Sequence, residues 1–96
     1  MIDKETARKL VSDRLQATNQ RDGLDLIVID DQTIEEDFGW IFFYSSKRYL
    51  ETHDIRYAVA GNAPMIVDRR DGSIHFTGTA EPTEKYIERY KKQRIG

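Results

Sequence analysis

Cysteine is absent from the 96-residue sequence, and histidine occurs only twice. A chain without thiols forms neither a disulfide framework nor a thiolate metal site. The N-terminus, Met1-Ile2-Asp3-Lys4-Glu5, is polar from its third residue, so we expect no signal peptide. The most apolar run, residues 38–44, is too short to span a membrane. These absences predict a cytoplasmic protein with no cofactor and no membrane partner.

Basic residues are missing between Asp22 and Asp37, a stretch that holds seven acids. Residues 1–54 carry 12 acids against 7 bases, whereas residues 55–96 carry 5 acids against 8 bases. An acidic patch repels nucleic acid and attracts a basic partner, although it can equally be a solvated loop that keeps the protein soluble. The predicted partner-binding residues are the acids nearest the most apolar run: Asp30, Asp31, Glu35, Glu36 and Asp37.

Residues 38–44, Phe-Gly-Trp-Ile-Phe-Phe-Tyr, form the most apolar stretch of the chain. Alternate side chains of a strand point to opposite faces, so this run has two apolar faces: Trp40, Phe42 and Tyr44 on one, Ile41 and Phe43 on the other. A strand that is apolar on both faces needs cover on both. We therefore predict an interior strand at the centre of the core, continuing to about Ser46.

Two amphipathic helices are predicted, one near each end of the chain. From Asp3 to about Asn19, helical spacing predicts a buried stripe of Ala7, Leu10, Val11, Leu15 and Thr18. Asp3 suits the N-cap of this helix, and Gly23 suits a left-handed turn after it. Pro82 suits the first turn of the second helix, whose predicted buried stripe is Tyr86, Ile87 and Tyr90.

Strand signals fill the chain between the helices. Three strands are predicted besides the central one: Leu24–Asp30, Met65–Asp68 after the corner at 61–64, and Ser73–Thr77 after the Asp71-Gly72 turn. The acidic run 30–37 fits either a wide hairpin loop or extra strand residues around Thr33-Ile34. Residues 47–60 are predicted to be irregular, with a possible turn of helix. The fold class is therefore α+β: one domain over residues 1–96, ordered helix, four strands, helix, with a mainly antiparallel sheet and the helices packed on it.

From Gly39 to Tyr90 the sequence resembles the immunity protein 35 family of YrhB-type domains. The resemblance lies in Gly39-Trp40 followed by Phe42-Phe43, in Tyr49-Leu50-Glu51-Thr52 with Asp54, in Gly61-Asn62-Ala63-Pro64 with Ile66-Val67-Asp68, and in Gly78-Thr79-Ala80. Gly-Trp and Gly-Asn-x-Pro together are the more specific pair. The motif residues, which we expect to be structural, are Gly39, Trp40, Gly61, Asn62, Pro64, Asp68, Gly72 and Tyr86.

This resemblance implies a non-enzymatic bacterial immunity protein that binds and neutralises a cognate polymorphic toxin. An alternative with the same origin is a small heat-stable chaperone that binds unfolded clients. The first predicts tight binding of one folded partner, and the second predicts weak binding of several unrelated clients. The sequence does not fix the oligomeric state and is compatible with a homodimer.

Catalytic, metal and nucleic-acid sites have weaker support in the residues themselves. Serines, His53 and His75 are present, but no glycine frame typical of a nucleophile elbow surrounds the serines, and we expect His75 to face outward from its strand. The acids at 30–37 lack the pattern of a calcium loop. Aromatic side chains on the central strand resemble a base-stacking platform, yet Glu35-Glu36-Asp37 just before them would repel phosphates.

Overall fold

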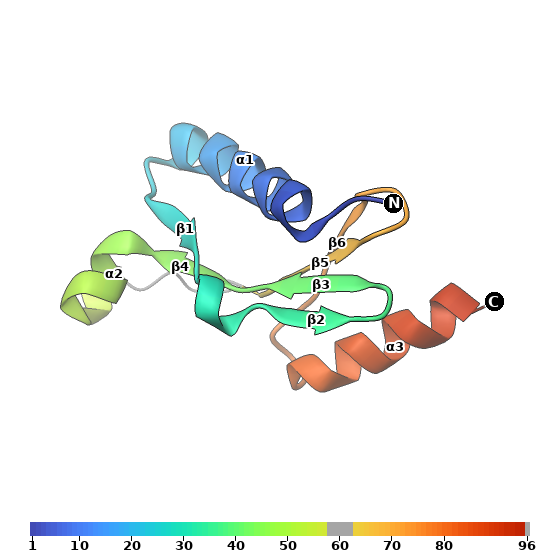
Figure 1. Cartoon of the computed structure of the whole chain (residues 1–96). Helices are drawn as coiled ribbons and strands as arrows, with labels where there is room; N and C mark the ends of the chain where they lie inside the picture. Colours follow the sequence, from blue (N-terminus) through green and yellow to red (C-terminus); the bar gives the residue numbers. More distant parts are fainter. Residues whose placement is uncertain (58–62, 96) are drawn as a thin grey trace.

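The computed structural model describes residues 1–57 and 63–95, and within them the chain forms an α+β fold, as predicted (Figure 1). Its elements in order are α1 (Lys4–Asp22), β1 (Leu26–Val28), the 3₁₀ turn η1 (Asp30–Gln32), β2 (Ile34–Glu36), β3 (Gly39–Phe42), β4 (Tyr44–Ser46), α2 (Lys47–Thr52), the 3₁₀ turn η2 (Ile55–Tyr57), β5 (Met65–Asp68), β6 (Ile74–Phe76) and α3 (Thr83–Ile95).

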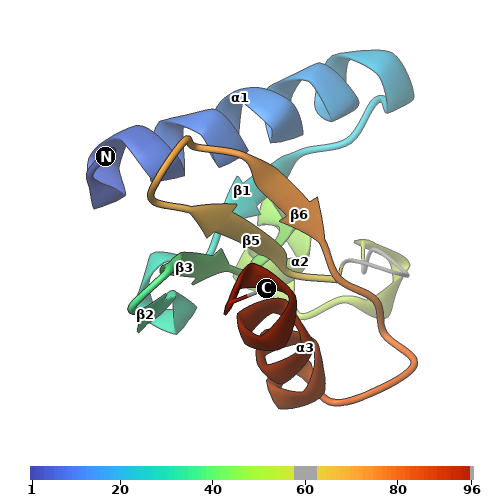
Figure 2. The ribbon, with the colours of Figure 1, turned by 90° about the vertical axis from the view of Figure 1, so that its right-hand side faces the viewer.

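The strands form two antiparallel sheets, one of four strands in the order β2-β3-β5-β6 and one of two strands, β1 and β4. Helix α1 lies on one side of the larger sheet and α3 on the other (Figures 1 and 2). Two apolar clusters lie on the two sides of the larger sheet. The α1 side gathers Ala7, Val11, Leu15, Leu26, Val28, Trp40, Phe42, Met65 and Val67, and the α3 side gathers Phe38, Ile41, Ile66 and Ile87.

Strand β3 is buried along its whole length, which confirms the predicted interior strand. Its two faces divide as the alternation predicts: Trp40 and Phe42 belong to the α1 cluster and Ile41 to the α3 cluster. The predicted single strand to Ser46 is wrong in one respect. The chain leaves the larger sheet at Phe43, whose carbonyl accepts a hydrogen bond from the Ile29 amide (2.8 Å), and β4 then pairs with β1 instead.

Helix α1 begins where predicted, but it continues to Asp22, past the predicted end at about Asn19. The Asp3 side chain caps it by accepting a hydrogen bond from the Thr6 amide (2.8 Å), and Gly23 closes it with φ 68°. Ala7, Val11 and Leu15 are buried, but Leu10 is 36% exposed, so its predicted burial is wrong. The three buried residues are spaced four apart and form one row along the helix. Leu10 lies beside this row, close to Gly72.

Two segments that the sequence left open are resolved by the structure. The acidic run contributes a strand, β2, as in the second alternative, and residues 47–52 form a regular helix. Six strands are therefore described instead of four, because β2 is added and the central stretch divides into β3 and β4. The corner residues Gly61 and Asn62 lie outside the described residues, whereas Pro64 is buried immediately before β5.

Candidate partner-binding surface

Strand β2 and its flanks carry the five acids that the sequence singles out, at one edge of the four-stranded sheet. Asp30 and Asp31 lie in η1, ahead of the strand. The other three acids, together with Arg69, line a groove of about 510 Å³: Glu35, Glu36 and Asp37. The structure therefore brings three of the predicted residues together and leaves Asp30 and Asp31 in η1, ahead of the strand. We call residues 35–37 the acidic border.

Three of the five acids already have a basic partner. Asp30 accepts two hydrogen bonds from the Arg8 guanidinium (2.5 and 3.1 Å), and this contact lowers the pKa of the Asp30 carboxyl. Glu36 pairs with Lys91 of α3 at 2.6 Å, and that hydrogen bond raises the pKa of Lys91. Glu35 lies 3.7 Å from Arg69. Asp31 and Asp37 are exposed, and among residues 1–57 and 63–95 neither forms an ion pair.

Arg69 fixes the acidic border to the core. Its guanidinium lies over the Trp40 ring, 4.9 Å from the centroid, and its Nη2 donates to the Glu36 carbonyl (3.0 Å). Its main-chain amide donates to the Phe38 carbonyl (2.8 Å). These three contacts tie the turn that carries the border to the buried Trp40 ring and to the main chain of residues 36 and 38.

Asp68 is a buried, charged residue whose hydrogen bonds to α3 were not predicted from the sequence. Its side chain is 1% exposed and accepts hydrogen bonds from the Tyr90 hydroxyl (2.5 Å) and the Arg94 Nε (2.8 Å), both on α3, and from the Arg70 amide (2.9 Å). Burial alone would raise the pKa of Asp68, but the hydrogen bonds from Arg94, Tyr90 and Arg70 outweigh it and hold that pKa well below its usual value. Burial, together with the bond to Asp68, raises the pKa of Tyr90 to about 12.

The Asp68 contacts fasten the C-terminal half of α3 to the end of β5. Lys91 and Arg94 of this helix, with Asp37 and Phe38, line a second hollow of about 340 Å³ beside the acidic border. The resemblance marked Asp68 as a motif residue, but its partners lie 22 and 26 residues away in the sequence.

Other motif residues have structural positions. A Cβ at Gly39 would lie 1.9 Å from the Val67 carbonyl oxygen, so the close approach of β3 to β5 requires glycine there. Trp40 is 3% exposed within the core. Gly72 turns the β5–β6 hairpin with φ 72°. The hydroxyl of Tyr86 would be 2.6 Å from a Cβ at Gly78, so this helix residue packs directly on the chain before α3.

The serines and histidines are used in local contacts. The Ser46 hydroxyl accepts a hydrogen bond from the Tyr49 amide at the start of α2 and donates to Asp25 (2.7 Å), while His53 ends α2 with φ 55°. Ser73 Oγ and His75 Nε2 lie 2.8 Å apart at the start of β6. His75 is exposed, but it does not simply face outward as predicted, because its ring packs against Tyr90 of α3 with the ring centroids 4.8 Å apart. The nearby Asp71 carboxylate accepts from the Ser73 amide (2.9 Å) and does not orient the imidazole.

Two features are absent from the part of the chain that the structure describes. No group of three or more histidine, aspartate or glutamate side chains is arranged to hold a metal ion in residues 1–57 and 63–95. No helix in the same part of the chain has the length and apolar character needed to cross a bilayer.

Comparison with known proteins gives one family and one relative. The family model described as immunity protein 35 matches residues 5–92. The protein named "Uncharacterized protein YrhB" of Escherichia coli (strain K12) is 45% identical over 60 residues, a match that covers 60% of this chain and 64% of that protein. The chain thus matches slightly less than two thirds of its relative's length. No solved structure matches significantly.

Proposed function

Because this chain belongs to the immunity protein 35 family, we propose that it binds a protein toxin inside a bacterial cell and neutralises it by occupying or distorting the toxin's active site. The action is stoichiometric and involves no turnover, and we place it in the cytoplasm. The observation that supports the proposal best is the acidic border: three carboxylates around a groove of about 510 Å³, anchored to the core by Arg69. Toxins that act on nucleic acids or other polyanions need basic substrate grooves, which carboxylates complement.

The charges divide into two kinds of contact. Asp31 and Asp37 are exposed, and we propose that they meet basic toxin residues directly. Asp30, Glu35 and Glu36 are paired with cations of this chain, so a toxin arginine would replace or share those partners. Rim charges of this sort raise the association rate and its sensitivity to salt more than they raise affinity.

The test is co-expression with the product of the adjacent gene, followed by measurement of the affinity and the salt dependence of any complex. Reversing Asp31, Glu35 and Asp37 to lysine should slow association on the order of tenfold or more and flatten its salt dependence. The matched control reverses Asp13, Glu84 and Glu88, which are exposed on α1 and α3, by the same total charge. If both triple variants bind alike, the acidic border is not the contact surface.

A chaperone-like role is the second candidate, and two exposed apolar side chains favour it: Phe76, 61% exposed, and Ile55, 83% exposed. Exposed apolar surface is what unfolded clients bind. The two roles separate in one assay, because a chaperone suppresses aggregation of several unrelated proteins, whereas an immunity protein acts on one folded toxin. Turnover of any substrate that disappears on changing His53 or His75 would contradict both.

A further inference from the structure

Strand β6 is the edge of the four-stranded sheet opposite the acidic border (Figure 2). The Asp68 amide donates to the Ser73 carbonyl (3.0 Å), the Thr77 amide donates to the Pro64 carbonyl (3.4 Å), and His75 is in register with Ile66. In an antiparallel ladder these residues turn their main-chain groups toward β5, so those of Ile74 and Phe76 point the other way. Within the described residues no strand pairs with that outer side.

Edge strands are normally protected by shortness, lysine, proline, inward charges or a bulge, because an open edge invites pairing. Strand β6 has only the first of these: it consists of three residues, Ile74, His75 and Phe76, and Phe76 is 61% exposed. The Arg14 guanidinium, 5.2 Å from the Phe76 centroid, touches one face of the ring and leaves the rest open. Apart from its shortness, the strand therefore has no feature that blocks pairing at its outer side.

The β6 segment is also its own antiparallel complement in chemical type. Read from either end, it is hydroxyl, apolar, histidine, apolar, hydroxyl: Ser73, Ile74, His75, Phe76 and Thr77. If two such segments pair with His75 at the centre, each isoleucine faces a phenylalanine and each serine faces a threonine. Aromatic residues beside β-branched residues, and hydroxyls beside hydroxyls, are favourable cross-strand pairs. The acidic border, by contrast, would oppose its own carboxylates.

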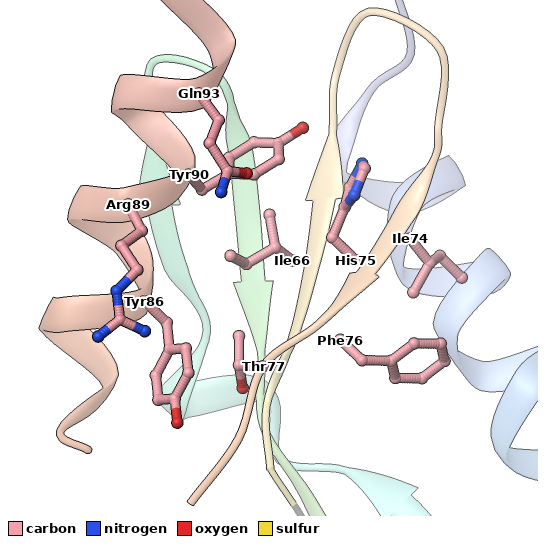
Figure 3. A pocket seen from close by; sticks show the side chains of 9 residues that line it. All are labelled: Ile66, Ile74, His75, Phe76, Thr77, Tyr86, Arg89, Tyr90 and Gln93. Carbon is pink, nitrogen blue, oxygen red and sulfur yellow. The ribbon is translucent and has the colours of Figure 1, made fainter. Parts of the chain in front are cut away.

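We propose that β6 pairs antiparallel with β6 of a second copy of this chain, about a two-fold axis at His75. The outward amides and carbonyls of Ile74 and Phe76 would form about four main-chain hydrogen bonds with the same residues of the partner subunit. The paired edge joins the two four-stranded sheets into one. It also places side by side the two copies of the groove of about 460 Å³ between β6 and α3, which His75, Tyr86 and Tyr90 line (Figure 3).

A short pairing segment limits the strength of this dimer. Three residues per strand give an interface smaller than that of a standard stable complex, so we expect dissociation on dilution, with a Kd on the order of 10 µM. The toxin surface proposed above lies at the opposite edge of the sheet and would stay accessible in the dimer. The dimer can therefore be tested without any toxin.

The first experiment uses the natural absence of cysteine. The two copies of His75 would face each other across the two-fold axis as a non-hydrogen-bonded pair. Their Cα atoms would be about 4.5 Å apart, a separation that a disulfide can bridge. His75→Cys should therefore form a covalent dimer on mild oxidation at least about tenfold faster than Ile55→Cys, whose site is 83% exposed but lies away from the sheet. Equal rates for the two variants would overturn the proposed pairing.

The second experiment is sedimentation over a range of concentrations. The natural chain should shift from monomer to dimer, Phe76→Lys should remain monomeric, and Ile55→Lys should dimerise normally; circular dichroism checks that each variant is folded. A natural chain that remains monomeric to about 1 mM would overturn the proposal. A dimer that persists in Phe76→Lys would also overturn it. So would the finding that β6 pairs with a strand of another protein but not with a second copy of this chain.

Discussion

The four-stranded sheet ends in β2 on one side and β6 on the other, and these two edges differ in almost every respect. Strand β2 carries Glu35 and Glu36, has ion pairs to Arg69 and Lys91, and turns into β3 through Asp37. Strand β6 carries no formal charge and leaves Phe76 61% exposed. Like charges keep identical edges apart, whereas an uncharged edge accepts a partner strand.

This difference suggests a division of tasks within one small sheet. The acidic edge is charged, anchored by Arg69 and suited to a basic surface of another protein. The β6 edge is uncharged and suited to main-chain pairing. If both proposals above hold, the first edge serves recognition and the second serves self-assembly, without competition between them. The predictions below change one edge at a time.

The largest effect is expected at Gly39, on which the position of the acidic edge depends. This residue has φ 153°, and an added Cβ would lie 1.9 Å from the Val67 carbonyl oxygen, which belongs to the backbone of β5 and cannot move aside cheaply. Gly39→Ala should lower the free energy of unfolding by more than about 4 kcal/mol, measured by urea denaturation.

Gly23→Ala is the matched control for this prediction. Gly23 also has a positive φ of 68°, but nothing lies within 4 Å of an added Cβ. The control should therefore show only the cost of the left-handed conformation, about 1 kcal/mol. Similar losses for the two variants would mean that backbone conformation, rather than the contact with Val67, makes glycine necessary at position 39.

The next largest effect is expected at Asp68, which joins β5 to α3 between the two edges. Asp68→Asn should cost about 3 kcal/mol, because it leaves the donors on Tyr90 and Arg94 poorly matched. The folded state lowers the Asp68 pKa, so its contribution is complete above about pH 4 and is lost as the pH falls below that value. The difference in unfolding free energy between the natural chain and the variant should therefore shrink in acid.

Tyr90 should make the free energy of unfolding depend on pH in the alkaline range, through the same link between β5 and α3. Its pKa is raised to about 12 in the folded state, so its contribution is present below about pH 10 and is lost as the pH rises toward 12. Tyr90→Phe should remove this alkaline component while leaving much of the acid component in place. If the variant and the natural chain lose stability in parallel above pH 10, the hydroxyl does not bind the Asp68 carboxylate as described.

Local sequence pattern was enough for some parts of this architecture. The division of Trp40 and Phe42 from Ile41 follows from strand alternation alone, and the Asp3 cap and the Gly72 turn follow from the preferences of single residues. The same logic explains the failure at Leu10, since helical spacing defines a stripe but not how far a neighbouring element covers its edge.

Other parts depend on contacts that sequence spacing does not reveal. Acidic residues disfavour strands, so the sequence alone does not identify β2. The strand is stabilised by pairing with β3 and by cations from Arg69 and α3. Asp68 meets partners 22 and 26 residues away, and no local pattern joins them. The five acids were found from charge alone, but the ion pairs of Asp30 and Glu36 depend on the positions of both terminal helices.

A smaller effect is expected from removing the charges that protect β2. In a Phe76→Lys background, which removes the β6 pairing, Glu35→Thr with Glu36→Thr should restore self-association through the other edge, with a Kd on the order of 100 µM by sedimentation. Glu84→Thr with Glu88→Thr, on the exposed face of α3, is the control for the change in net charge. A double variant at 35 and 36 that remains monomeric would show that β2 is shielded by something other than its carboxylates.

The smallest effects compare two arginines of α1, one serving each edge. Arg8 pairs with Asp30 just before the acidic edge, with both side chains largely exposed, and Arg14 lies over Phe76 of β6. Arg8→Met and Arg14→Met should each cost about 0.5 kcal/mol or less. Salt should distinguish them, because an exposed ion pair is screened within a Debye length whereas stacking on a ring depends less on ionic strength. Urea denaturation at low and high salt should therefore shrink the Arg8→Met loss more than the Arg14→Met loss, and equal salt responses would contradict the assignment of different contacts to the two edges.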